Sequence, residues 1–318
     1  MRGNSGRREA VDRRGAAGIH LISKGSAITV FLQIPYIDRA AKFVRVDVLC
    51  EERPEIEGKI ERDRKDSALK EAADCAFLIN EQATRPGSEN DTKGLKKLYG
   101  VPLTADNVIV TPPKPNKKGK VTGKPKVELE VNGERVHIRD AGAAAEVQRR
   151  VAAGESLEDS SYWLKSHGAT TLEGRHVVET PEGVRLQFMG KEGVWHDHLV
   201  ENPELAKMLT ERKASANTRG GKLFAINDTK LGNYVKTLDH GRVTPKDFRT
   251  ARANEIAAAE IAKLPPQSPP KDEKEAKARK IQLAKNVSRK LGNKPQQCID
   301  SYINPVHWQH QSFQVATA

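Results

Sequence analysis

Residues that end one helix and begin another, close to the C-terminus, constrain the fold of this chain most. Leu291-Gly292 ends a basic helical pattern, because glycine readily adopts the left-handed conformation that closes many helices. Pro295 is typical of the first turn of a following helix. Tyr302 then lies about two turns further along. The sequence therefore predicts two consecutive helices, the second of which presents a tyrosine.

Composition indicates the kind of partner. The 318 residues include 54 Lys and Arg against 42 Asp and Glu, a net charge of +12, which favours a polyanion such as nucleic acid. The three cysteines lie too far apart to suggest a zinc or redox pair. No apolar run is long enough to span a membrane, and the Arg-rich start lacks the apolar core of a signal peptide. We expect a cytoplasmic protein that has no membrane partner.

The N-terminal part reads as two short regions. Residues 1–25 combine arginine with Gly and Ser, which is typical of a flexible basic arm. Ala27–Ile34 and Phe43–Leu49 are rich in β-branched and aromatic residues and predict two strands in a reduced segment at 26–65. The remaining residues, 66–318, are interpreted as one domain.

That domain opens with a predicted core helix. Asp66 or Ser67 can cap it. Its expected buried face consists of Leu69, Ala73, Ala76 and Phe77.

A separate module is predicted at about 106–166. It begins with a run at 111–126 that contains six lysines and no acid, which suits a solvated linker or a DNA-backbone contact: Lys114, Lys117, Lys118, Lys120, Lys124 and Lys126. Asn132-Gly133 predicts a type I′ hairpin. In the resulting register Val127 faces Ile138, Leu129 faces Val136, Glu130 faces Arg135 and Glu128 faces His137. A helix capped by Asp140 follows and ends at Gly154, and another begins near Ser156.

A second hairpin carries a lysine at its tip. Val184–Val200 reads as strand, Gly-flanked tip and strand, so Lys191 projects from the end. His196 and His198 fall on one face of the second strand because side chains alternate with a period of two. Their spacing suggests a metal site, but no third ligand is evident, and we expect no metal.

Thr244 to Arg249 form a predicted helix start. Thr244 suits the N-cap, Pro245 the first position and Asp247 the third position of a capping box. Arg249 is unfavourable there, because the N-terminal end of a helix already carries partial positive charge. A locally disfavoured cation indicates an anionic ligand. The expected buried side consists of Phe248, Ala251, Ile256 and Ala259.

The order of these segments resembles the type IB DNA topoisomerases of the small poxviral and bacterial kind. In that family a His or Asn stands nine positions before the nucleophilic tyrosine, and here Asn293 lies nine positions before Tyr302. The resemblance covers residues 66–105 and 167–306. The further matching segments, in order, are Ala83-Thr-Arg85-Pro-Gly, Gly168-Ala-Thr-Thr-Leu, Phe188-Met-Gly-Lys191-Glu-Gly, a moderate match at Arg219–Phe224, and Lys246-Asp-Phe-Arg249-Thr.

The resemblance implies an α+β fold: a mainly helical catalytic domain of the topoisomerase IB and tyrosine recombinase type with a small antiparallel sheet, preceded here by a short β-containing segment. The family's N-terminal domain, which closes over DNA, has room here for only part of its usual length. The module at 106–166 is not normally present in the family and is interpreted as an insertion.

The implied activity is relaxation of supercoiled duplex DNA by a monomer, without metal, ATP or other cofactor. Tyr302 would form a 3′-phosphotyrosyl link, Arg85, Arg249 and Asn293 would bind the phosphate, and Lys191 would protonate the leaving oxygen. DNA contacts are expected from Lys246, Lys114, Lys117, Lys118 and Lys120. The implied setting is the cytoplasm of a bacterial or phage-infected cell. Two alternatives remain at this point: a tyrosine recombinase, which would normally carry His at position 246, and a basic DNA-binding protein without catalytic activity.

Overall fold

The architecture comes from a computed structural model of the chain. It gives the backbone of three strands before residue 32 and describes residues 43–315, side chains included, apart from short gaps. These gaps are 48, 88–100, 102, 116–118, 122–124, 139–141, 155–164, 192–193, 217–220 and 265–268, although the helix that begins at Ala141 is described as backbone.

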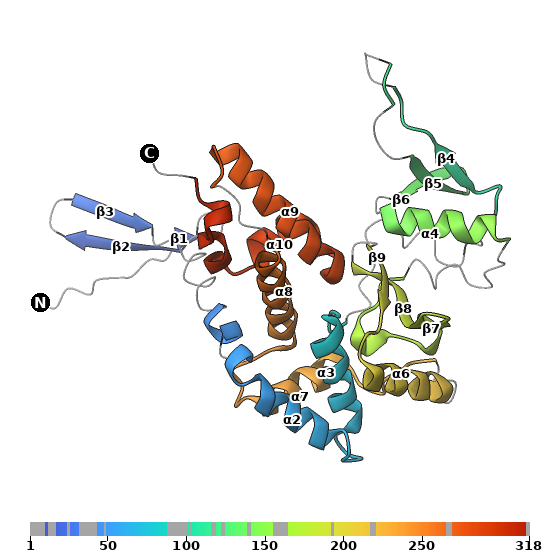
Figure 1. Ribbon diagram of the computed structural model, residues 1–318, viewed down its shortest axis with the longest axis horizontal. Coiled ribbons are helices and arrows are strands. Elements are labelled where there is room, and N and C mark those ends of the chain that lie inside the picture. Colours follow the sequence, from blue (N-terminus) through green and yellow to red (C-terminus); the bar gives the residue numbers. More distant parts are fainter. Residues whose placement is uncertain are drawn as a thin grey trace, which may run out of the picture.

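Antiparallel sheets and helices alternate along the chain, which confirms the α+β prediction. The described residues form three sheets of three consecutive strands each, in the orders β1-β2-β3, β4-β5-β6 and β7-β8-β9. The third sheet comprises β7 (Val177–Thr180), β8 (Gly183–Gly190) and β9 (Val194–Leu199). In Figure 1 it lies between the module on one side and α6 (Pro203–Ala216) on the other. The sheet therefore joins the module to the helical part.

Most helices share one apolar core with this sheet. Leu186 and Phe188 of β8 pack in the same cluster as Leu78, Leu209 and Phe248 from three different helices. The helices of this region are α2 (Arg53–Asp63), α3 (Lys70–Gln82), α6, α7 (Asp228–Leu238) and the first part of α8 (Pro245–Ala262). A buried ion cluster also ties α3 to α6, because Asp74 is fully buried and accepts a hydrogen bond of 3.0 Å from Nε of Arg212.

A second apolar cluster holds the C-terminal segment against α8. It contains Ala257 of α8, Val287 of α9 (Glu273–Leu291), Cys298 of α10 (Pro295–Ser301) and Phe313. Two short 3-10 helices, Pro305–Gln309 and Gln311–Phe313, follow α10. No helix among the described residues combines the length and apolar character needed to cross a bilayer.

In the described part of the module, three strands form a sheet that one helix covers. It comprises β4 (Val108–Thr111), β5 (Lys126–Val131), β6 (Glu134–Ile138) and α4 (Ala141–Ala152). The predicted register is confirmed for all four pairs, from Val127 opposite Ile138 to Glu130 opposite Arg135. Asn132 and Gly133 have φ values of 51° and 80°, as the type I′ turn requires. The predicted second helix start at Ser156 lies outside the described residues.

The prediction of a strand at Phe43–Leu49 is wrong, because residues 43–47 and 49–51 are helical. Val44 and Val46 alternate with polar residues, but the buried side chains are Phe43, Val46 and Leu49, which follow a helical spacing of three. The strand predicted at 27–34 is confirmed in part by β3 (Ser26–Phe31). Two strands, β1 (Ala10–Val11) and β2 (Ala17–Ser23), lie in the region predicted to be an arm.

Two helix details also differ from the predictions. Helix α3 begins at Lys70, and Leu69 is 36% exposed rather than buried, because residues 67–69 form a turn before it. On α8 the predicted capping box between Thr244 and Asp247 is present. Ala259 is exposed, since the buried stripe of that helix runs through Ala253 and Ala257 instead.

Candidate active site

Four of the five predicted catalytic residues meet in one cluster. Arg85 follows α3, and Arg249 lies at the start of the second turn of α8. Asn293 lies between α9 and α10, and Tyr302 is the C-cap of α10. Oδ1 of Asn293 accepts hydrogen bonds from Nη2 of Arg85 at 2.9 Å and from Nη2 of Arg249 at 3.2 Å. The guanidinium carbon of Arg249 lies 5.5 Å from the centre of the Tyr302 ring. Segments more than 200 residues apart thus form one polar site.

Arg249 is the buried centre of this cluster, with 2% of its side chain exposed. Its Nη1 donates to the carbonyl of Ala83 and its Nη2 to the carbonyl of Leu291, which are the C-cap of α3 and the last residue of α9. The Nε atom is buried and has no hydrogen-bond partner among the described residues. Arg249 therefore joins two helix ends and still has one donor available for a ligand.

The loop that carries Arg85 is held in place by the segment Gly168–Thr171. The amide of Ala169 donates to the carbonyl of Arg85, and the amide of Thr170 donates to that of Pro86, each at 2.8 Å. Gly87 has a φ of 139°, and a Cβ atom there would lie 2.3 Å from Oγ1 of Thr170. Only glycine fits this close approach, which explains why an Arg-x-Gly pattern serves here.

Tyr302 is buried, with 4% of its surface exposed, and its backbone is held by Asn254. Nδ2 of Asn254 donates to the carbonyl of Tyr302 at 3.0 Å, and Oδ1 accepts from the amide of Asn304 at 2.7 Å. Asn254 lies on α8, slightly more than one turn after Arg249. No local pattern predicts this residue, because its partners are 48 and 50 positions away.

The charges around Tyr302 favour its ionised form. Burial alone would raise the pKa of the phenol, but the charges of Arg249 and Arg85, a hydrogen bond from Arg249 and the charge of Lys246 outweigh burial and lower the pKa. The neighbouring thiol of Cys298 behaves differently, because burial raises its pKa to about 11 despite the charge of Arg249. Of the two groups, only the phenol has a lowered pKa, as an activated nucleophile requires.

The cluster carries positive charge that its own surroundings do not neutralise. Among the described residues, neither Arg85 nor Arg249 forms an ion pair with a carboxylate, whereas Arg64, Arg212 and Arg242 each do. Repulsion from Arg85 adds to burial in lowering the pKa of Arg249. Two close arginines without an acid form a site for an anion such as phosphate.

Lys191, the fifth predicted catalytic residue, is not in contact with the cluster. It follows β8 at the predicted hairpin tip, and its side chain is exposed. Lys246 is exposed in the first turn of α8, close enough for its charge to act on Tyr302.

His196 and His198 face the same side of β9, as predicted, and form a pair. Nδ1 of His196 and Nε2 of His198 are 2.9 Å apart, and the ring of His196 stacks on Phe188 at 4.7 Å. No group of three or more His, Cys, Asp or Glu side chains suited to a metal lies in the described part of the chain. The ring of His196 lies against Gly292, which directly precedes Asn293, a contact that spacing alone did not predict.

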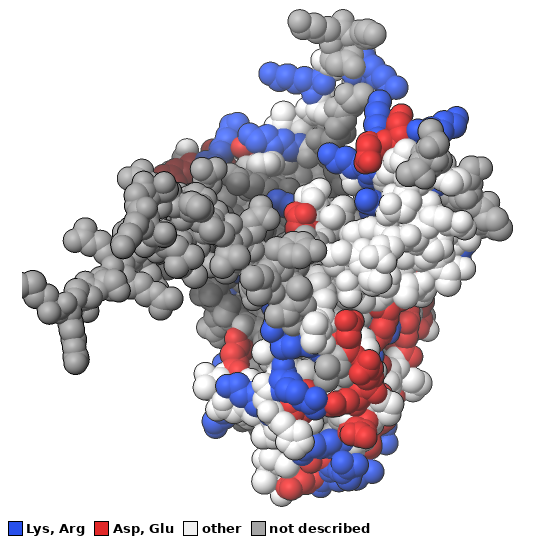
Figure 2. Space-filling model, turned by 90° about the vertical axis from the view of Figure 1, so that its left-hand side faces the viewer, with Lys and Arg blue, Asp and Glu red and all other residues white. Residues whose placement is uncertain are grey.

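The lysine-rich run at 111–126 forms an extension between β4 and β5, which we call the lysine finger. Lys114 and Lys120 are exposed beside an antiparallel bridge between Pro115 and Val121, and Figure 2 shows basic side chains at the end of the molecule to which the finger projects. Lys126 pairs with Glu128 at 2.7 Å, so its charge is partly neutralised. Lys117, Lys118 and Lys124 lie outside the described residues.

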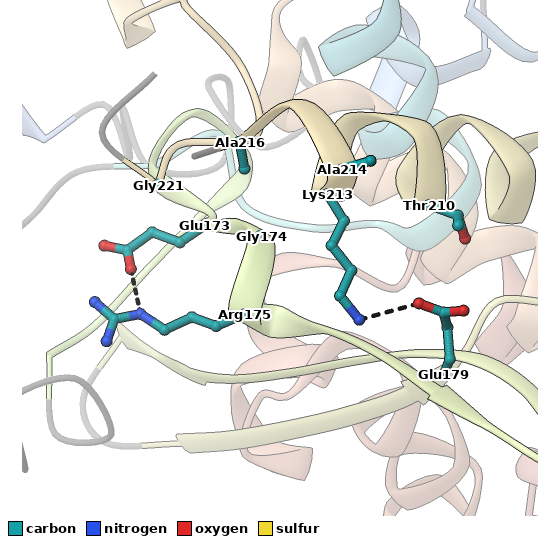
Figure 3. Close-up of a pocket in the computed structure, with 9 residues that line it drawn as sticks. All are labelled: Glu173, Gly174, Arg175, Glu179, Thr210, Lys213, Ala214, Ala216 and Gly221. Atoms are coloured by element: carbon teal, nitrogen blue, oxygen red, sulfur yellow. Dashed lines mark hydrogen bonds and ion pairs between the residues drawn. The ribbon is translucent and has the colours of Figure 1, made fainter. Parts of the chain in front are cut away.

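A cavity of about 530 Å³ lies apart from this chemistry, between β7 and α6 (Figure 3). Its charged lining is internally paired, with Lys213 and Glu179 3.0 Å apart and Arg175 and Glu173 2.6 Å apart. None of the cluster residues lines it. The chemistry of the site therefore rests on the tyrosine cluster and not on this cavity.

Part of the chain is similar in sequence to known proteins. Residues 150–302 match the family model described as eukaryotic DNA topoisomerase I, catalytic core. The protein named DNA topoisomerase 1B from Acanthamoeba polyphaga mimivirus is 28% identical over 138 residues, which is 40% of this chain and 41% of the viral protein. The chain thus matches about two fifths of the length of that relative. The family match includes Lys191, Arg249, Asn293 and Tyr302, whereas Arg85 precedes it.

Proposed function

We propose that this relative of the type IB DNA topoisomerases relaxes supercoiled duplex DNA by cutting and resealing one strand. The observation that carries the proposal is the convergence of Arg85, Arg249 and Asn293 around a buried tyrosine with a lowered pKa. The two arginines lack a carboxylate partner among the described residues, so a DNA phosphate supplies the charge that the site needs.

The proposed reaction is a transesterification. The oxygen of Tyr302 loses its proton and attacks the phosphorus, forming a bond to the 3′-phosphate while the bond to the 5′ oxygen breaks. The 5′ oxygen takes a proton and leaves as a hydroxyl. After the free strand has rotated, this hydroxyl attacks the phosphotyrosine and restores the phosphodiester. The covalent link retains the energy of the broken bond, so no ATP is consumed.

The cluster is proposed to accelerate the reaction by electrostatic stabilisation of the transition state. Arg85, Arg249 and Asn293 bind the non-bridging oxygens, where negative charge grows in the transition state. Guanidinium groups suit this role because their paired N–H donors match phosphate geometry and stay charged. The Nε donor of Arg249, which is buried and has no partner in the described part of the chain, is proposed to bind such an oxygen.

Lys191 is assigned to the proton transfer. Its ammonium group can give up a proton to the 5′ oxygen, which an arginine cannot do at ordinary pH. The exposed hairpin tip allows the side chain to approach DNA bound over the cluster.

The lysine finger and Lys246 are proposed to bind the DNA backbone. Lys246 lies beside the cluster, while the finger projects from the module that packs next to β9. Because one chain supplies every assigned group, the proposal requires no second subunit. It places the protein on DNA in the cytoplasm as a monomer.

Relaxation of supercoiled plasmid in EDTA and without ATP tests the activity. Tyr302→Phe should bind DNA like the parent yet give no covalent adduct, because the phenolic oxygen is the proposed nucleophile. An adduct that persists in this variant would assign the nucleophile to another of the five tyrosines. A parent protein that leaves the plasmid supercoiled would refute the proposed function.

A further inference from the structure

The imidazole ring of His196 lies between the two segments that carry assigned catalytic residues outside the helices. On one side it contacts Gly190, which directly precedes Lys191. On the other side it contacts Gly292, which directly precedes Asn293. One side chain thus contacts both the hairpin that carries Lys191 and the turn that carries Asn293.

Both glycines leave room for this ring. A Cβ atom on Gly190 would lie 2.4 Å from Nε2 of His196, and a Cβ atom on Gly292 would lie 2.1 Å from Cε1. Gly292 also needs its left-handed φ of 62° to end α9. Gly190 has no such backbone requirement, so its lack of a side chain serves the fit against His196.

The ring is held firmly in this position. It stacks on Phe188 with an interplanar angle of 3°, and its Nδ1 atom is hydrogen-bonded to His198, which fixes its rotation. Burial, followed by the charges of His198, Arg249 and Arg85, lowers the pKa of His196 well below its usual value. An uncharged ring is what a position beside two arginines requires.

We infer that His196 is a positioning residue, a rigid spacer that sets the location of the Lys191 hairpin relative to the phosphate-binding cluster. The inference rests on the proposed function, because it takes the roles of Lys191 and Asn293 from it. The cluster keeps its own hydrogen bonds when the ring is removed, since Arg249 binds the carbonyl of Leu291 directly. Loss of the ring therefore affects the proton transfer by Lys191 more than phosphate binding.

The leaving group of the substrate provides a selective test. We would measure single-turnover cleavage at saturating enzyme on DNA with a 5′ oxygen at the cleaved bond and on DNA with sulfur in its place. A thiol leaving group needs little protonation, so His196→Ala should lose about 10-fold or more on the oxygen substrate, part of the 10²–10⁴-fold worth of a general acid, and little on the sulfur substrate. Lys191→Ala should show the same selectivity with a larger loss.

His176→Ala is the matched control. His176 is also buried, its ring centre lies 6.1 Å from that of Phe188, and none of the atoms nearest to either glycine belongs to it. Any loss caused by general weakening of the fold should affect both substrates equally in this variant.

A second variant keeps the test decisive if His196→Ala does not fold. Gly190→Ala retains the ring but pushes the hairpin against it, and should show the same oxygen-selective loss. The double variant should be no worse than His196→Ala, because the clash needs the ring. Equal losses on both substrates in His196→Ala and Gly190→Ala, or no loss in either, would overturn the inference. If the parent cleaves neither substrate, the proposed function falls and the inference falls with it.

Discussion

Asn254→Ala should both weaken the fold and slow DNA cleavage, because this side chain holds the backbone at the proposed nucleophile and two residues after it. The substitution removes the hydrogen bond to the carbonyl of Tyr302 and the one from the amide of Asn304. It also removes a bond of 2.7 Å from Nδ2 to the carbonyl of Thr250 within α8. Two of these three bonds connect α8 to the end of α10.

The magnitude follows from these bonds. Each hydrogen bond contributes roughly 0.5–1.5 kcal/mol net, so the two connecting bonds amount to about 1–3 kcal/mol of the free energy of unfolding. A nucleophile displaced by about 1 Å can lose on the order of 10²-fold in rate. We expect a loss of about 10- to 100-fold in adduct formation at saturating enzyme, with DNA affinity close to that of the parent.

Urea unfolding and single-turnover adduct formation measure the two effects. Asn286→Ala is the matched control, since Asn286 bonds to Glu260 and Arg289 on the surface of α8 and α9 and contacts no catalytic residue. If Asn254→Ala were destabilised and still formed the adduct at the parent rate, Asn254 would serve the fold alone. If stability and rate were both unchanged, the bonds would not form in solution.

Further substitutions test the charge and geometry of the site, the binding of the DNA backbone and the pH dependence of stability. Arg249→Lys should form the adduct at least about 10²-fold more slowly and unfold at a lower urea concentration. A lysine lacks the forked guanidinium group that binds two backbone carbonyls and, as proposed, the phosphate. Full activity of this variant would show that the positive charge alone suffices. Asn293→His should keep substantial cleavage activity, since either side chain can donate one hydrogen bond to phosphate, and an inactive variant would contradict that role. Replacing the six lysines of the finger by Gln should flatten the salt dependence of duplex binding by several units, at about 0.9 per phosphate contact, with little change in single-turnover cleavage; an unchanged slope would identify the finger as a spacer. Burial and the charge of Lys290 lower the pKa of His198 to about 4. As the pH drops from about 6.5 to 4, the unfolded chain therefore binds a proton at His198 before the folded protein does, and the free energy of unfolding should decrease by up to about 3 kcal/mol. If urea unfolding of His198→Gln showed the same pH dependence as the parent, this explanation would be wrong.

Local patterns predicted the parts of the site that depend on neighbouring residues. Gly292 ends α9 and Pro295 opens α10, which brings Tyr302 to its position at the end of α10. The register of the β5–β6 hairpin could also be predicted from the sequence, because the Asn132-Gly133 turn determines it. The alternation of apolar and polar residues at 43–49 led to the wrong prediction of a strand. The same residues also fit a helical pattern, and the buried side chains follow that pattern.

Other features depend on contacts that no local pattern encodes. Arg249 was predicted to need an anion because it lies at a helix start, and the structure adds that two backbone carbonyls already bind its guanidinium. From the sequence, His196 suggests only a metal ligand, because the residues that it contacts, Gly190 and Gly292, lie on different segments. The two glycines were the only sequence features that could have indicated this contact, but each is equally typical of a turn or a helix end.

The packing of the module limits how this protein could be shortened. Met189 is 2% exposed because it belongs to the apolar cluster of the module, and Trp195, opposite it on β9, packs against the same cluster. These two residues flank the tip that carries Lys191. A truncated protein made by excising residues 106–166 would therefore expose an apolar pair at the base of the Lys191 hairpin. The module cannot be treated as a detachable accessory, and a minimal version of this protein would need polar replacements at both positions.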